Sequence, residues 1–342
     1  MIFYFLLLLF FAVVHCKFYK YPNIDYLDKN NTDTIKGFFL ILVFLSHITG
    51  YYNFNSEYDR PYFAIRNLMG QGIVTFFLFC SGYGIMEAIK KDINYIYKIF
   101  KNRFCKTLLH FDIAITVFLF VNLLLGYDVL FENYIFSLLA WTGIGNSVWY
   151  IFCILYLYLI TYLIFKIIVQ RKESMDYKQA ILILFLFCIL YVCVISKYRE
   201  LYWYDTIFCY PFGMLYSLYK KQLFDLLSKK KNILFFSIII FASIFLIYNL
   251  KQFLIIKFIY NIVFVSIILI LMMYVKCNNS FLMYIGQNLF GFYILQRITM
   301  FVLQDLNLIN NKYIYVAIVF LLLFPINYIF NKFIKMIDLR IF

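Results

Sequence analysis

The sequence predicts an all-α fold, a polytopic transmembrane helical bundle with about ten or eleven spans. The chain has 342 residues, of which 65% are hydrophobic, 23% aromatic and only 14% charged. A soluble domain of this length has too little interior to bury so much apolar surface. The apolar residues also form long runs, and in hydrocarbon such runs must be helices that satisfy their own backbone hydrogen bonds.

The expected spans follow one another along the whole chain. We interpret residues 1–16 as an extra N-terminal transmembrane helix that could act as a signal anchor, because no basic residue precedes the run and no small-residue cleavage site is clear. Residues 130–143 are more weakly apolar and predict an interfacial or re-entrant helix. The other spans are expected at about 36–52, 67–89, 107–126, 146–168, 179–196, 206–219, 233–249, 253–275, 288–304 and 313–331.

The basic residues indicate how the chain is oriented. The net charge is +14, and the lysines lie in short clusters between the apolar runs. This pattern is typical of cytoplasmic loops and gives no indication of a nucleic-acid partner. With residues 17–36 placed in the cytoplasm, most of the 31 Lys and Arg residues lie inside. The C-terminus is then inside and, if the first run spans, the N-terminus is outside, in a bilayer that we expect to be a bacterial inner membrane.

The eight cysteines give no sign of a metal site. Most of them lie inside apolar runs, and no CxxC pair occurs. We therefore expect neither a zinc site nor a disulfide framework, and interpret these cysteines as small buried hydrophobic residues. No other metal is expected.

Titratable residues inside a span are costly, so they are hypotheses for functional sites. His47 lies eleven residues beyond Lys36 in one apolar run. That distance is roughly 16 Å along a helix and close to three turns, so the two side chains share one face. A buried imidazole can accept a proton from a hydroxyl, and a cation at the inner end can hold an anion. The alternative is a His that bonds to a neighbouring helix and a Lys that snorkels to the membrane surface.

The next span carries a cluster of small residues. Ser81 and Gly82 follow Phe77 in the run GQGIVTFFLFCSGYG, and small residues let a helix or a ligand approach the backbone. A basic loop that includes Arg103 and Lys106 comes next. Such a loop suits phosphate groups and equally suits anionic lipids.

These features resemble the acyltransferase-three family, bacterial integral membrane proteins that mostly O-acetylate surface polysaccharides and similar glycans. The first core helix of that family carries Arg, ten intervening residues and then His, and Lys36 and His47 keep this spacing. Its second core helix carries Gly-x-x-x-Phe-Phe-x-x-Ser-Gly, and Phe77, Ser81 and Gly82 match it in register.

Later motifs of the family are matched more weakly. Arg103 with Lys106 resembles an Arg-x-x-Arg motif on the cytoplasmic side, and residues 148–150 resemble the aromatic start of a later span. Near the end of the chain, Gly286 and Tyr293 match a Gly-x-x-Ser-Tyr-x-x-Tyr-Leu-x-His pattern. The resemblance covers roughly residues 34–335.

The sequence departs from the family at several positions. Lys36 replaces Arg and loses the fork that holds a phosphate or carboxylate in two hydrogen bonds. Gly72 lies one residue early in the second motif, and Gln296 occupies the position of the final His, so no second proton carrier is assigned there. Residues 1–16 add a run before the usual core of the family.

The resemblance implies a membrane O-acyltransferase. It would move an acetyl or similar acyl group from acyl-CoA, usually acetyl-CoA, on the cytoplasmic side to a hydroxyl of a surface or cell-envelope glycan or of a lipid-linked sugar. His47 would be the general base or a relay. The residues expected to bind the donor are Lys36, Ser81, Gly82, Arg103 and Lys106, and those expected to contact the sugar are Trp149 and Tyr150.

Two other classes of membrane protein share the general composition. A glycan polymerase or a lipid-linked oligosaccharide flippase is also aromatic-rich and basic inside, but is not expected to have the Lys36-to-His47 spacing. A small-molecule transporter should show charged or broken helices near the midplane. Arg297 is such a charge, and it could pair with a substrate anion in either class or with a neighbouring helix.

Overall fold

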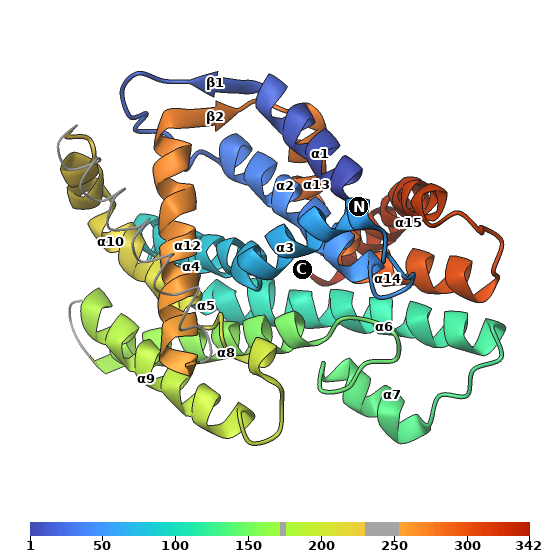
Figure 1. Cartoon of the computed structure of the whole chain (residues 1–342). Helices are drawn as coiled ribbons and strands as arrows, with labels where there is room; N and C mark the ends of the chain where they lie inside the picture. Colours follow the sequence, from blue (N-terminus) through green and yellow to red (C-terminus); the bar gives the residue numbers. More distant parts are fainter. Residues whose placement is uncertain (172–175, 230–252) are drawn as a thin grey trace.

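The computed structural model describes residues 1–171, 176–229 and 253–342, and these are almost entirely helical (Figure 1). The elements are α1 Ile2–Val14, β1 Cys16–Phe18, α2 Lys29–Ile48, η1 Glu57–Asp59, α3 Arg60–Met69, α4 Gly72–Lys91, α5 Tyr95–Ile99, η2 Phe100–Cys105, α6 Lys106–Leu124, α7 Phe131–Leu138, α8 Trp149–Arg171, α9 Tyr177–Ile195, η3 Leu201–Trp203, α10 Cys209–Leu227, α12 Leu254–Tyr274, β2 Val275–Cys277, α13 Ser280–Gln287, α14 Leu289–Asp305 and α15 Lys312–Ile341.

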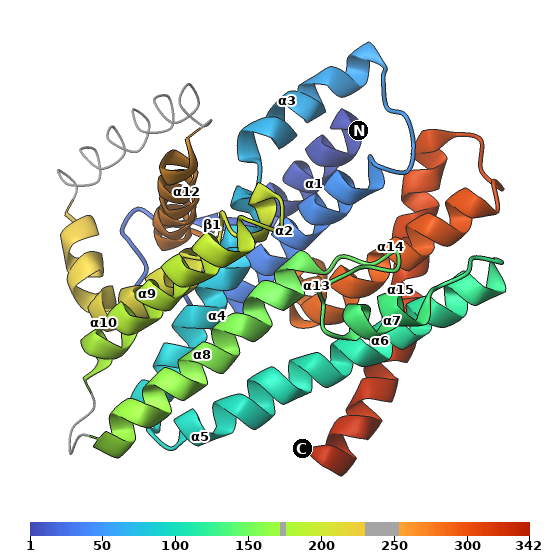
Figure 2. The same cartoon turned by 90° about the horizontal axis from the view of Figure 1, so that it is seen from below.

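The structure confirms the prediction of an all-α polytopic bundle. Among the described residues, six helices are long and apolar enough to cross a membrane. The predicted total of about ten or eleven spans also counts α2, α10 and α14, which are shorter or more polar but lie where spans were expected. The predicted span 233–249 lies outside the described residues. Figure 2 shows α8 lying between α9 and α6 along the length of the molecule.

Glycines let two pairs of helices approach to backbone contact. Gly37 of α2 lies against the carbonyl oxygen of Leu282 in α13, and Gly286 of α13 lies against the carbonyl oxygen of Asp33 in α2. Gly82 of α4 packs in the same way on the carbonyl oxygen of Tyr210 in α10. A Cβ atom at any of these positions would overlap the facing backbone, so the close packing depends on glycine.

Helix α1 adds to one side of this bundle. Its 13 residues extend roughly 20 Å, and it occupies the run 1–16 in which an extra N-terminal helix was expected. It packs on α2 and α3, and the hydroxyl of Tyr4 donates to the backbone oxygen of Tyr313 over 2.7 Å. An apolar cavity of about 520 Å³ lies between α1, α2, α13 and α15.

A short antiparallel ribbon joins the segment after α1 to the segment after α12 (Figure 1). Lys17 lies opposite Lys276 in this ribbon, which agrees with the prediction that both face the same side of the membrane. The ammonium of Lys276 pairs with Asp28 over 2.5 Å, and this hydrogen bond raises the pKa of Lys276. The other oxygen of Asp28 accepts from the backbone N–H of Asn31 and caps the start of α2.

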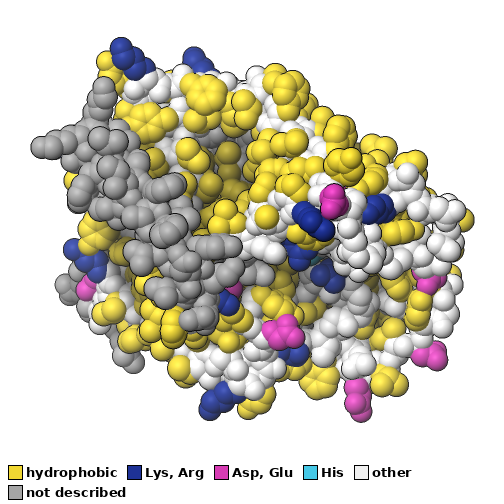
Figure 3. All heavy atoms as spheres, in the orientation of Figure 1, with side chains coloured by type: hydrophobic (Ala, Val, Ile, Leu, Met, Phe, Trp, Pro, Cys, Tyr) yellow, Lys and Arg dark blue, Asp and Glu magenta, His cyan; other side chains and the backbone are white. Residues whose placement is uncertain are grey.

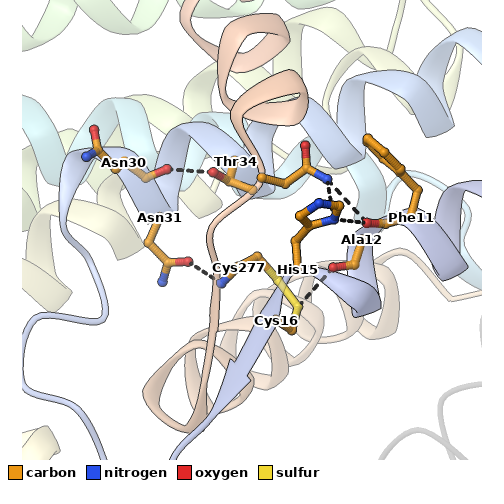
Figure 4. Close-up of a disulfide and its surroundings, with 9 residues drawn as sticks. Phe11, Ala12, His15, Cys16, Asn30, Asn31, Thr34 and Cys277 are labelled. Carbon is orange, nitrogen blue, oxygen red and sulfur yellow. Dashed lines mark hydrogen bonds between the residues drawn. A yellow bond between two sulfur atoms is a disulfide. The ribbon is translucent and has the colours of Figure 1, made fainter.

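The ribbon carries a disulfide between Cys16 and Cys277 (Figure 4). The expectation of no disulfide is therefore wrong. Sequence spacing could not reveal this bond, because the two cysteines become opposite residues only when β1 and β2 pair. The ring nitrogen Nδ1 of His15 lies 3.0 Å from the backbone oxygen of Phe11, and Asn279 contacts the same two groups from α13. These contacts attach the end of α1 to the α13 side of the bundle.

The disulfide can be tested by counting thiols. Cys80, Cys105, Cys153, Cys188, Cys193 and Cys209 are free. Denatured, non-reduced protein should therefore take up six equivalents of N-ethylmaleimide, and reduced protein should take up eight. The Cys16→Ser variant should take up seven equivalents without a reductant, measured by intact-mass spectrometry. Eight equivalents on non-reduced wild type would contradict the bond.

The glycine contact between α4 and α10 can be tested with a matched pair of variants. Gly82→Ala pushes a methyl group into the carbonyl of Tyr210 and should cost about 1–3 kcal/mol of stability. Gly84→Ala is the control, because a Cβ atom there meets nothing within 4 Å. Thermal unfolding in detergent should show a lower midpoint only for Gly82→Ala. Equal midpoints would show that the close approach is not needed.

Candidate active site

His47 lies in the last turn of α2, at the end that the basic residues predict to be the outer one. Its ring is close to that of Tyr293 in α14, with 6.5 Å between ring centroids. The Nδ1 atom of His47 is buried and has no hydrogen-bond partner among the described residues. A buried polar atom without a partner is rare and indicates that something else, such as water or a ligand, supplies the hydrogen bond.

Other unpartnered polar atoms lie around the same histidine. Tyr293 is 5% exposed and Ser147, just before α8, is also 5% exposed, yet neither hydroxyl makes a well-formed hydrogen bond within the described residues. Gln296 is 1% exposed; its amide N–H donates to the backbone oxygen of Tyr293 over 2.8 Å, whereas its Oε1 is unpaired. Leaving several such groups unpaired in a bundle core costs free energy. The cluster is therefore a candidate binding site for a polar ligand.

Two arginines lie beside this cluster. Arg297 of α14 and Arg66 of α3 are both near enough to act electrostatically on the imidazole of His47. Arg66 donates to the hydroxyl of Thr49, the residue that ends α2, over 2.8 Å. The Nε of Arg297 is buried and has no partner. Figure 3 shows Lys and Arg side chains gathered over α3 on this face of the molecule.

The aromatic residues predicted to contact sugar lie on the other side of Tyr293. The ring of Tyr150 packs edge-on against that of Tyr293, with 5.5 Å between centroids, and lies 6.3 Å from the ring of Phe77. Trp149 contacts Tyr150 and the ring of Tyr202. Tyr150 is buried and so belongs to the cluster, whereas Trp149 is partly exposed at its edge.

Lys36 lies in the interior of α2, which begins at Lys29, and not at its inner end as expected. Its ammonium pairs with Asp33 over 2.7 Å, and the second carboxylate oxygen of Asp33 is buried without a partner. Lys36 also lies near Cys80 of α4. The structure therefore places Lys36 on the same helix as His47, as predicted, but its charge is already balanced by a carboxylate.

Ser81 and Arg103 are brought together through a tyrosine. The hydroxyl of Ser81 is 2.7 Å from that of Tyr158 in α8, and Arg103 acts electrostatically on the same Tyr158. Arg103 donates from Nε to the hydroxyl of Tyr95 over 2.9 Å. Among the described residues it has no carboxylate within 4 Å, so its charge is available to a ligand.

Lys106 and Gly82 have structural contacts of their own. Lys106 pairs with Asp338 near the end of α15 over 2.7 Å, and His110 contacts the other oxygen of that carboxylate over 2.8 Å. Gly82 faces α10.

In the described part of the chain, no group of three or more His, Cys, Asp and Glu side chains could hold a metal ion.

The sequence suggested no role for Ser147 or Arg66, whereas Arg297 was expected to pair either with a substrate anion or with a neighbouring helix. The useful signal for the arginines was that both lie on the side of the membrane where basic residues are scarce. No local pattern marks Ser147, because its role depends on the packing of the segment before α8 against α14.

A comparison with known protein families finds a match over most of the chain. The family model described as an acyltransferase domain matches residues 29–332. No curated protein and no solved structure matches the chain. The matched region begins at the first residue of α2 and ends within α15, so it contains every residue of the candidate site. The chain is a multi-pass membrane protein that belongs to the integral-membrane acyltransferase-three family.

Proposed function

We propose that the protein is an O-acyltransferase that moves an acetyl or similar acyl group from acyl-CoA to a hydroxyl of a cell-envelope glycan, in a bacterial inner membrane. The observation that carries this proposal is the buried, unpartnered Nδ1 of His47, which lies among other unpartnered polar groups. A base with a free nitrogen in a site that can bind a polar ligand is what hydroxyl activation requires.

His47 would act on the acceptor hydroxyl. The hydroxyl donates its proton to Nδ1 as its oxygen attacks the carbonyl carbon of the thioester. The bond between this carbon and sulfur then breaks, the acyl group stays on the sugar oxygen, and the coenzyme A thiolate leaves. The imidazolium returns the proton to the thiolate, so His47 is neutral again at the end of the cycle.

The donor would enter from the inner end of α2. Arg103, whose guanidinium has no carboxylate partner, is the strongest of the predicted donor contacts and suits a phosphate oxygen. Ser81 lies near Arg103, because the hydroxyl of Ser81 contacts that of Tyr158, which in turn interacts electrostatically with Arg103. Lys36 and Lys106 are held by Asp33 and Asp338, so they would contribute to the potential at this end but would have to exchange partners to bind phosphate.

The acceptor would approach from the outer end, where His47, Tyr150 and Tyr293 lie together. An aromatic ring such as Tyr150 or the adjacent Trp149 can pack on the apolar face of a sugar. This arrangement separates a cytoplasmic donor from an outer acceptor along one helix, which agrees with the positive-inside orientation.

The role of His47 can be tested in cells. In cells that lack the protein, wild type should restore acetyl esters on the envelope glycan. His47→Gln should lower the ester content by about 100-fold or more, the usual effect of losing a general base. His15→Gln is the matched control, because His15 lies at the C-terminal end of α1, beside the disulfide, and is not part of the His47 cluster. Equal membrane levels of all forms are required.

Two outcomes would contradict parts of this proposal. Full acetylation with His47→Gln would keep the enzyme but remove His47 as its base. A deletion that changes glycan length or export and leaves acetylation intact would support a polymerase or a flippase.

The donor site can be tested by steady-state kinetics in detergent. Arg103→Gln should raise the KM for acetyl-CoA about ten-fold with a smaller change in kcat, because it removes one charge-assisted hydrogen bond. Lys101→Gln is the control: Lys101 belongs to the same turn, but its ammonium lies over the ring of Phe342. Equal KM values for the two variants would exclude a specific role for Arg103.

A further inference from the structure

We propose that Arg66 and Arg297 form an anion-binding site beside His47 and that the natural acceptor is an acidic glycan, one that bears a carboxylate or a phosphodiester next to the hydroxyl to be acylated. This inference rests on the proposed function and names the class of its acceptor.

The first support is the lack of charge balance around these two residues. Neither arginine has a carboxylate within 4 Å among the described residues. Cations embedded in a membrane bundle are costly unless they are paired. Two uncompensated guanidinium groups near one imidazole therefore indicate that an anion binds there.

Other cations at the outer end differ in this respect. Lys312 pairs with Asp59, and the exposed Arg60 pairs with Glu57. The guanidinium of Arg199 lies over the rings of Trp141 and Trp203, 4.1 Å and 4.6 Å from their centroids, and donates to the backbone oxygen of Trp141. Arg66 also has neutral partners, the hydroxyl of Thr49 and the ring of Phe63. What distinguishes Arg66 and Arg297 is that two guanidinium groups without a carboxylate lie together beside one imidazole.

The second support comes from polar groups that complete the site. Tyr293 and Ser147 are nearly fully buried, and their hydroxyls lie close enough to interact with each other, but neither makes a well-formed hydrogen bond within the described residues. Both lie in the same cluster, because Arg297 and Ser147 each interact with Tyr293. The hydroxyl of Tyr51 also interacts with Arg297. Guanidinium groups with nearby hydroxyl donors match the geometry of carboxylate and phosphate oxygens.

The donor is a poor candidate for this anion. Its thioester must reach His47 to react, and the pantetheine arm then holds the phosphates of coenzyme A well away from that residue. Lys36 and Arg103 lie toward the inner end, and Lys36 is roughly 16 Å from His47 along α2. An anion at the outer end is therefore supplied by the acceptor.

The site also links binding to reactivity. An anion bound between the two arginines and His47 would stabilise the imidazolium that forms when His47 takes the proton of the acceptor hydroxyl. A neutral sugar would therefore bind weakly and react slowly.

The proposal can be tested by ligand binding to purified protein in detergent at low ionic strength, where screening is small. The probes are methyl β-D-glucuronide for a carboxylate, glycerophosphoglycerol for a phosphodiester, and methyl β-D-glucoside as the neutral match. At least one anionic probe should bind about ten-fold more tightly than the glucoside and raise the thermal unfolding midpoint. The anionic probe that does so shows whether the natural acceptor bears a carboxylate or a phosphodiester.

Variants show whether the two arginines are responsible. Arg66→Gln and Arg297→Gln should each remove the preference for the anionic probe, and Arg→Lys at either position should restore part of it. Arg60→Gln should bind as wild type does, because Arg60 is an exposed residue paired with Glu57. If no anionic probe is preferred, or if both Gln variants keep the preference, the proposal is overturned.

Acetyl transfer to the same probes separates this inference from the proposed function. Arginine-dependent binding of an anion without acetyl transfer from acetyl-CoA would support the anion site and contradict the acyltransferase proposal. Wild-type rates of transfer in both Gln variants would support the acyltransferase and overturn the anion site. Equal loss of kcat on acidic and neutral acceptors would also overturn it, because the arginines would then stabilise the transition state itself.

Discussion

The close contact between α2 and α13, made possible by Gly37 and Gly286, is the constraint on which the candidate site depends. In a bilayer, helices gain little from burying apolar surface against each other, so close packing must hold them together. Helix α13 is followed directly by α14, which carries Tyr293, Gln296 and Arg297. The position of α14 relative to His47 therefore depends on how α13 lies against α2. The equivalent contact between α4 and α10 positions Ser81 next to α8.

The polar groups around His47 come from four different parts of the chain: α2, α3, the segment before α8, and α14. Burying them without partners costs free energy that a purely structural core would avoid. The rest of the bundle has long apolar helices whose outer faces expose residues such as Phe10, Leu186 and Ile255 to lipid. Single unpartnered atoms also occur elsewhere, as at Asp112 and Asp205. Around His47, however, several of them come from different segments, which is typical of a site that exchanges protein partners for those of a ligand.

The sequence predicted the parts of the structure that are decided locally. Apolar runs located most of the long helices to within about five residues, because each must satisfy its own backbone in hydrocarbon. The exceptions are α2, which begins seven residues before its expected span, and α10 and α15, which end eight and ten residues after their own. The spacing from Lys36 to His47 also placed both on α2. Short elements such as α3 and α13 could not be predicted, since neither is long enough to give a clear apolar run. The pairing of Lys36 with Asp33 was also missed, although the two residues are one helical turn apart.

The disulfide makes much of the chain a closed covalent ring. Cys16 and Cys277 are 261 residues apart in the sequence, and the ring between them contains His47, Arg66 and Ser147. Tyr293 and Arg297 lie on the tail that leaves the ring after Cys277, so the site is assembled from ring and tail together. Helix α1 lies before the matched family region and is joined to the ring at Cys16, the first residue of the ring. A single backbone cut within the ring would leave all parts of the site on one covalent molecule until the bond is reduced.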